Sequence, residues 1–173
     1  YWEIWNEPDL PDPGTGIGSP TWGGTREQFF EFYHIAATHL KQCFPHLKIG
    51  GYASCGFYAI AAPSPAREQS YLGFFDNFLR SVKENGAPLD FFSWHSYSTA
   101  IHISAIDKKL HELLEERGYG NIETHLTEWN PVHTEYGTGH HSAEVSAVLI
   151  ALQQGHCDVA CIYDMRTNSG VYA

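Results

Sequence analysis

The sequence predicts an α/β fold, in which helices pack against a parallel β-sheet. Short apolar segments alternate with amphipathic ones in the order β-α-β-α-β-α-β-α-β, which is typical of parallel strands joined by helical crossovers. Unusual residues follow the predicted strands, whereas the returns from helix to strand are short and plain. No linker, internal repeat or low-complexity segment divides residues 1–173. We therefore expect a single domain over residues 1–173.

The first third of the chain predicts two strands around one helix. Tyr1–Trp5 is the first strand, and a loop rich in Gly and Pro follows it from Pro8 to Gly24. Thr25 stands three residues before Gln28, the spacing of a capping box, and so predicts a helix start. Lys48–Ser54 is the second strand. The residues at helical spacing on one face, expected to point inward, are Phe29, Phe32, Tyr33, Ala36 and Leu40.

The remainder repeats this alternation. Three further strands are expected at Phe91–Tyr97, Glu123–Glu128 and Val159–Asp164. Three helices separate the strands: one over about 70–85, one ending near Gly118, and one running from Ser142 to Gly155. The apolar residues expected to face inward from these helices are Leu72, Phe75, Leu79, Val82, Ile106, Leu110, Leu113, Leu114, Val145, Val148, Leu149 and Leu152.

Two of the predicted strands lead into glutamates that are crowded by aromatic residues. Glu7 lies in Tyr-Trp-Glu-Ile-Trp-Asn-Glu-Pro-Asp (1–9), and Glu128 lies in Leu-Thr-Glu-Trp-Asn (126–130). The carboxyl ends of parallel strands meet at one edge, in a (β/α)₈ barrel and in an open doubly wound sheet alike. Cleavage of a glycosidic bond requires one carboxylic acid and one carboxylate, whose different environments separate their pKa values. The pattern therefore predicts a site for glycoside hydrolysis.

The motifs also resemble a known family. Trp-Asn-Glu-Pro (5–8) and Thr-Glu-Trp-Asn (127–130), whose glutamates are 121 positions apart, resemble the clan A glycoside hydrolases. Ile-Gly-Gly (49–51) and Ser-Trp-His-Ser-Tyr (93–97) most resemble glycoside hydrolase family 39, which includes β-xylosidases and α-L-iduronidases. The resemblance implies a partial (β/α)₈ TIM barrel, from about strand 4 through strand 8. Because the chain begins at Tyr1, we expect an excised or processed C-terminal part of that barrel.

The resemblance also implies roles for individual residues. Glu7 would be the general acid/base and Glu128 the nucleophile of a retaining enzyme, with β-xylosides as the expected substrates, and Asn6 would bind the 2-hydroxyl of the sugar. Tyr97 or His95, which end the preceding strand, would point at Glu128. Each of these residues also has a structural reading, as a capping or core side chain. Further candidates for a sugar cleft, from their positions in loops and at strand ends, are Trp22, Trp129, Tyr163 and Asp164.

Composition excludes several classes of partner. The net charge is −10 and no run of Lys or Arg occurs, which argues against nucleic acid and against an anionic membrane surface. No apolar stretch reaches the length of a membrane span. Eleven histidines form no HExxH-type spacing, so neither a metal nor a cofactor is expected. Cys43, Cys55, Cys157 and Cys161 are expected to be buried free thiols.

Two alternatives to a carboxylate-based glycosidase remain. A metal-dependent hydrolase would lose activity to a chelator. A catalytically incomplete carbohydrate-binding or interaction fragment would have no turnover. In that case the exposed edges of a partial barrel would favour a homo-oligomer, because unpaired strand edges associate readily.

Overall fold

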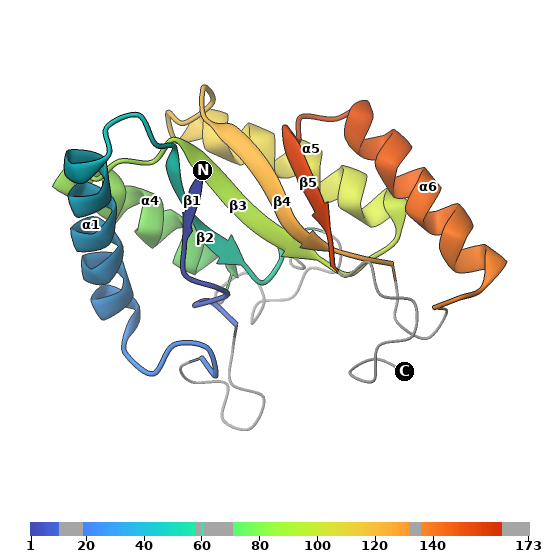
Figure 1. Cartoon of the computed structure of the whole chain (residues 1–173), viewed down its shortest axis with the longest axis horizontal. Coiled ribbons are helices and arrows are strands. Elements are labelled where there is room, and N and C mark those ends of the chain that lie inside the picture. Colours follow the sequence, from blue (N-terminus) through green and yellow to red (C-terminus); the bar gives the residue numbers. More distant parts are fainter. Residues whose placement is uncertain (11–18, 58–59, 61–70, 132–135, 164–173) are drawn as a thin grey trace.

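The computed structural model describes residues 1–10, 19–57, 60, 71–131 and 136–163. Five parallel strands form one sheet in sequence order, and the described helices lie along one of its faces (Figure 1). The strands are β1 (Trp2–Ile4), β2 (Ile49–Ser54), β3 (Phe91–Ser96), β4 (Glu123–Trp129) and β5 (Val159–Ile162). The helices are α1 (Arg26–Cys43), α4 (Gly73–Asn85), α5 (Ala100–Glu116) and α6 (Gly139–Gln153). The predicted α/β fold is confirmed.

The strand order distinguishes between the two parallel architectures. In a doubly wound sheet the order reverses at a switch point, whereas here each strand pairs with the next one along the chain. The sheet is also strongly curved. The hydroxyl of Thr127 on β4 donates a 2.8 Å hydrogen bond to Oε1 of Glu3 on β1, although β2 and β3 lie between these strands. In a flat sheet three strand spacings would separate them by about 14 Å. The sheet therefore has the curvature of a barrel wall.

Local sequence signals explain where the elements begin and end. The Thr25 side chain accepts the N–H of Gln28, and the Gln28 side chain accepts the N–H of Thr25, so the predicted capping box is present. Gly86 ends α4 in the left-handed conformation, at φ 62°. α6 begins at Gly139, three residues before the predicted start, because the Thr138 side chain accepts the N–H of His141 and caps the helix there.

The core lies between the helices and the sheet and is rich in aromatic residues. Tyr52 of β2 is in contact with Phe74 and Phe78 of α4, with ring centroids 4.9 and 4.8 Å apart. Most of the predicted inward positions are buried or packed against this core. Leu149 is the exception at 49 % exposed, because it lies beside the exposed Ile150 while Val148 and Leu152 of the same helix are buried.

The Ile-Gly-Gly motif allows β2 to lie close to both of its neighbours. A Cβ atom on Gly50 would lie 2.3 Å from the carbonyl oxygen of Phe91 on β3. A Cβ atom on Gly51 would lie 2.8 Å from the carbonyl oxygen of Ile4 on β1. Glycine is therefore required at both positions for β2 to pair as it does.

The cysteine prediction is half correct. All four cysteines lie among the described residues and are free thiols. Cys55 is buried, but Cys43 and Cys161 are exposed, since they lie at the end of α1 and on the outermost strand β5. No helix within the described part of the chain is long and apolar enough to cross a membrane.

Candidate active site

Glu7 lies in a tight turn that follows β1. The backbones of Trp5 and Glu7 are left-handed, with φ of 72° and 50°. For residues other than glycine this conformation costs on the order of 1–3 kcal/mol and persists only where surrounding contacts hold it. Those contacts are present: the Glu7 N–H donates to the Ala53 carbonyl at 2.9 Å, and the Glu7 carbonyl accepts the Ser19 hydroxyl at 3.2 Å. The Thr21 hydroxyl donates to the same carbonyl.

Glu128 reaches the inner face of the sheet, which is the face opposite the helices, through an irregularity in β4. The register between β4 and β5 shifts between Leu126 and Trp129. As a result the consecutive residues Thr127 and Glu128 both contact inner-face side chains, Thr127 reaching Glu3 and Glu128 reaching His95. A regular strand would send one of the two to the opposite face.

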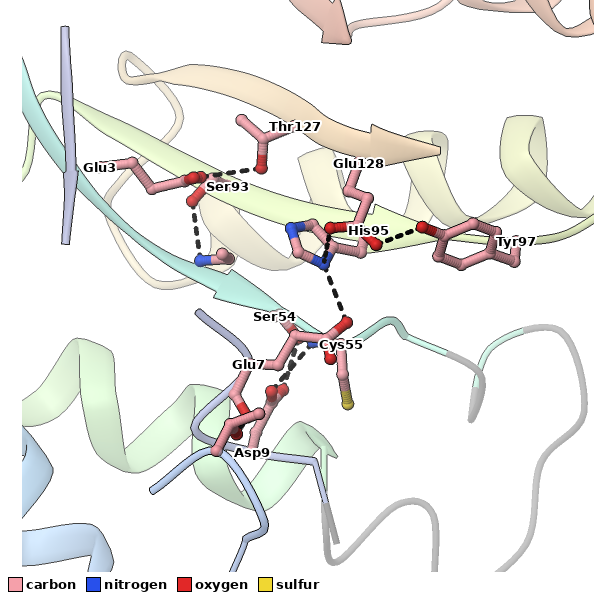
Figure 2. Close-up of polar contacts among 12 residues, drawn as sticks. Glu3, Glu7, Asp9, Ser54, Cys55, Ser93, His95, Tyr97, Thr127 and Glu128 are labelled. Atoms are coloured by element: carbon pink, nitrogen blue, oxygen red, sulfur yellow. Dashed lines mark hydrogen bonds and ion pairs between the residues drawn. The ribbon is translucent and has the colours of Figure 1, made fainter. Parts of the chain in front are cut away.

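His95 on β3 lies between the two glutamates (Figure 2). Its Nδ1 is 2.9 Å from Oε1 of Glu7 and 3.8 Å from Oε2 of Glu128. These two carboxylate oxygens are therefore no more than about 6.7 Å apart, the sum of 2.9 and 3.8 Å. The Tyr97 hydroxyl donates to Oε1 of Glu128, so Tyr97 and His95, which were expected as alternatives, both contact Glu128.

The surroundings of the pair combine a buried histidine with accessible carboxylates. His95 is 2 % exposed, whereas the side chains of Glu7 and Glu128 are 19 % and 24 % exposed. The histidine is therefore fixed in the sheet, while both carboxylates can be reached from solvent. Such an arrangement can deliver and remove protons at one end and present an oriented carboxylate at the other.

The remaining predicted residues are distributed around this pair. Asn6 is exposed and lines a shallow pocket with Trp5 and Thr21. Tyr163 is partly exposed at the end of β5, where its carbonyl accepts the amide N–H of Asn130 at 2.8 Å. Their contacts with sugar stay predictions. Asp164 lies outside the described residues.

Trp129 and Trp22, the two tryptophans expected near a sugar cleft, pack against other parts of the fold. Trp129 is buried in the core, because strand alternation directs it to the face opposite Glu128. Trp22 is anchored against α1: its indole N–H donates to the Thr25 carbonyl at 2.8 Å, and its ring packs edge-on against Phe29. Both side chains therefore have structural contacts in this fold, and their predicted role in sugar binding stays a prediction.

Asp9 is a feature of the site for which the sequence predicts no role. Its carboxylate is buried and accepts the Ser54 hydroxyl at 2.5 Å and the Cys55 N–H at 2.9 Å. Burial raises the pKa of Asp9 to about 6, and these hydrogen bonds oppose the shift only in part. In the sequence, an Asp that follows Glu-Pro is equally typical of an ordinary turn, so only the contacts with β2 reveal it.

This buried carboxylate predicts a pH-dependent stability. The folded state binds the Asp9 proton more tightly than the unfolded chain does. The favourable contribution of Asp9 to the free energy of unfolding is therefore present below about pH 4 and is lost as the pH rises through 6. The loss amounts to about 3 kcal/mol. The free energy of unfolding of Asp9→Asn, relative to wild type, should rise by a comparable amount between pH 4 and pH 7 in urea titrations.

The control for this measurement is Glu84→Gln, which removes an exposed carboxylate from the outer surface of α4. Its unfolding free energy should follow that of wild type across the same pH range. If the free energy of unfolding of Asp9→Asn relative to wild type stays constant, or falls as the pH rises, the pKa of Asp9 is not raised in the folded protein.

Within the described residues, no group of three or more His, Cys, Asp or Glu side chains is arranged to hold a metal ion. His133 lies outside these residues. His141 instead pairs through Nε2 with the side-chain oxygen of Asn130 at 2.9 Å.

Comparison with known proteins places the chain in a family. The family model for glycosyl hydrolases family 39 matches residues 1–163. The chain belongs to glycosyl hydrolase family 39. Among curated family relatives, a β-xylosidase of Caldicellulosiruptor saccharolyticus is 31 % identical over 147 residues, which cover 75 % of this chain and 25 % of the relative. A β-xylosidase of Geobacillus stearothermophilus is 24 % identical over 171 residues, 85 % of this chain and 30 % of the relative.

Solved structures agree on the fold. A glucosidase from Croceicoccus marinus superposes with a TM-score of 0.74 at 26 % identity, over 94 % of this chain and 32 % of that chain. A family 39 β-xylosidase from Caulobacter crescentus superposes with a TM-score of 0.63 at 23 % identity, also over 94 % and 32 %. These neighbours are TIM-barrel enzymes, so the five-stranded sheet is part of such a barrel. The family 39 chain spans about a quarter to a third of the length of these relatives.

Proposed function

We propose that this family 39 chain carries the catalytic carboxylates of a retaining glycosidase. Glu128 is the nucleophile and Glu7 is the general acid/base. In the first step Glu128 attacks the anomeric carbon while Glu7 protonates the leaving oxygen. In the second step Glu7 takes a proton from the water that releases the sugar from Glu128.

The observation that carries the proposal is the contact of His95 with both carboxylates. Retaining enzymes hold their carboxyl groups about 5–5.5 Å apart, whereas inverting enzymes need about 6.5–9.5 Å to admit a water molecule. The upper bound of about 6.7 Å, the sum of 2.9 and 3.8 Å, excludes almost the whole inverting range for the two oxygens nearest His95. It therefore supports double displacement.

The contacts also support the division of roles. Glu128 accepts the hydroxyl hydrogen of Tyr97, and a carboxylate held by such a donor is oriented for attack on the anomeric carbon. Glu7 has a histidine as its nearest partner, which can exchange protons with it. Asn6, which is next to Glu7 and exposed, would bind a sugar hydroxyl.

The substrate class we propose is a β-xyloside. It rests on the reported relatives and structural neighbours, three of which are named β-xylosidases, while one is named a glucosidase. We also propose that residues 1–173 form one domain, the C-terminal part of the barrel. Exposed side chains on both outer strands, such as Trp2 and Val159, support pairing of these edges with further strands or with a second copy.

Hydrolysis of an aryl β-xyloside, followed by proton NMR, tests the function. The first sugar formed should be the β-anomer, which changes to the equilibrium mixture only later, because two inversions at one carbon give net retention. A chelator should leave the rate unchanged, and an aryl β-glucoside run in parallel reports sugar preference.

Each other result favours a different function. The α-anomer as first product would rule out double displacement. Loss of turnover with the chelator would favour the metal-dependent hydrolase. Binding of xylo-oligosaccharides without hydrolysis would favour the incomplete carbohydrate-binding fragment.

A further inference from the structure

We propose that Asp9 is a positioning residue that holds the general acid/base Glu7 in its productive orientation by fastening the turn after β1 to the end of β2. This inference rests on the proposed function of Glu7. Asp9 itself lies behind the site, with its carboxylate directed at Ser54 and Cys55 rather than at the inner face (Figure 2).

The contacts form a continuous set. The Glu7 N–H donates to the carbonyl of Ala53, and two residues later the Asp9 carboxylate accepts from Ser54, the last residue of β2, and from Cys55, which follows it. Both ends of the short Glu7–Asp9 segment are thus tied to residues 53–55. Pro8, buried between them, fixes its own φ and removes one degree of freedom from the segment.

Backbone conformation explains why such fastening is needed. Glu7 and Ala53, the two partners of the backbone hydrogen bond, are both left-handed, with φ of 50° and 54°. Residues other than glycine leave this conformation unless the surrounding structure over-determines it. Releasing Asp9 would remove two of the hydrogen bonds that hold the turn, and the Glu7 carboxyl would move away from Nδ1 of His95.

The contacts of Asp9 with Ser54 and Cys55 form a clamp between the turn and β2. The chemistry of this clamp also points to function rather than to stability. Both groups that donate to Asp9 are neutral, a hydroxyl and a backbone amide, so the buried charge has a desolvation cost that they offset only in part. A side chain retained against its cost in stability is typical of a functional site.

The clamp should act on one catalytic step only. Glu128 is held by Tyr97 and His95, which belong to β3 and the residues just after it, and neither contacts Asp9 among the interactions of the described residues. Loss of the clamp should therefore impair protonation of the leaving group and leave nucleophilic attack almost intact. A displacement of about 1 Å in a catalytic group can reduce a rate by about 100-fold.

The experiment compares two aryl glycosides, one with an acidic phenol that leaves without protonation and one with a weakly acidic phenol that requires it, in the intact protein. Asp9→Ala should lower kcat/KM about 10- to 100-fold on the second substrate and less than about threefold on the first. Asp9→Asn should restore most of the loss, because its side-chain oxygen can accept from Cys55 and its NH₂ can donate to the hydroxyl oxygen of Ser54.

A matched control is Asp107→Ala. Asp107 is another buried carboxylate that accepts a backbone N–H, from His156 at 2.7 Å, but it lies on α5 away from the carboxylate pair. Removal of the Asp107 carboxylate should change kcat/KM on both substrates by the same factor. Ser54→Ala, which removes one hydrogen bond of the clamp, should give a smaller loss with the same preference and serves if Asp9→Ala does not fold.

The inference is overturned if Asp9→Ala and Ser54→Ala lower kcat/KM on both substrates in equal proportion, as is expected of Asp107→Ala. It is also overturned if neither variant changes kcat/KM on either substrate. A crystal structure of the Asp9→Ala protein in which the Glu7–His95 contact is kept at 2.9 Å would overturn it independently of activity. Failure of the wild-type protein to cleave either glycoside would instead refute the proposed function, and the inference with it.

Discussion

The Glu128→Ala variant is expected to lose at least about 10⁴-fold in kcat/KM on every glycoside, whatever its leaving group. Without the carboxylate no glycosyl-enzyme can form, and an acidic leaving group does not replace the missing nucleophile. The alanine also leaves the Tyr97 hydroxyl without its carboxylate acceptor. Turnover of aryl β-xylosides over a range of phenol acidities measures the effect.

Glu123→Ala provides the matched control, because Glu123 is a second partly exposed glutamate at the opposite end of the same strand β4. It pairs with His125 rather than with Glu7 or Glu128. This variant should keep turnover within a few-fold of wild type. Residual activity of Glu128→Ala comparable to that of Glu123→Ala would mean that another group is the nucleophile.

The parts of this structure that the sequence predicts well depend on local signals. The capping box at Thr25 and the left-handed Gly86 define helix ends through contacts within a few residues. The meeting of Glu7 and Glu128 at one edge also follows from sequence, because the carboxyl ends of parallel strands share that edge. The contact of the Tyr97 hydroxyl with Glu128 lies at the same edge.

The details of the site depend on contacts that join distant parts of the chain. His95 is closer to Glu7, 88 residues away, than to the predicted partner Glu128. The register shift in β4 that places Thr127 and Glu128 on one face has no counterpart in the alternation of apolar residues. Asp9 reads as a turn residue until Ser54 and Cys55 are brought against it.

The Glu7→Ala variant is expected to lose activity selectively, on glycosides whose leaving group needs a proton. On glycosides with weakly acidic phenols kcat/KM should fall by about 10²–10⁴-fold, the usual contribution of general acid catalysis. On strongly activated glycosides kcat/KM should stay close to wild type, because the phenolate leaves without a proton. Release of the sugar from Glu128 then lacks its base, so a burst of phenol should precede slow turnover.

Glu3→Ala is the control on the same strand segment, since Glu3 is an inner-face glutamate that contacts Thr127 and lies four residues before Glu7. It should affect all substrates alike. If Glu7→Ala and Glu128→Ala behave alike on activated glycosides, the two roles are wrongly assigned.

The Glu7→Ala background also decides whether Asp9 acts through Glu7. Two residues that act on one step are not additive, whereas independent contributions multiply. Adding Asp9→Ala to Glu7→Ala should therefore change kcat/KM on weakly acidic phenols by less than about twofold, although Asp9→Ala alone lowers it at least about tenfold. If the double variant instead loses the product of the two single effects, Asp9 contributes to catalysis by a route that does not pass through Glu7.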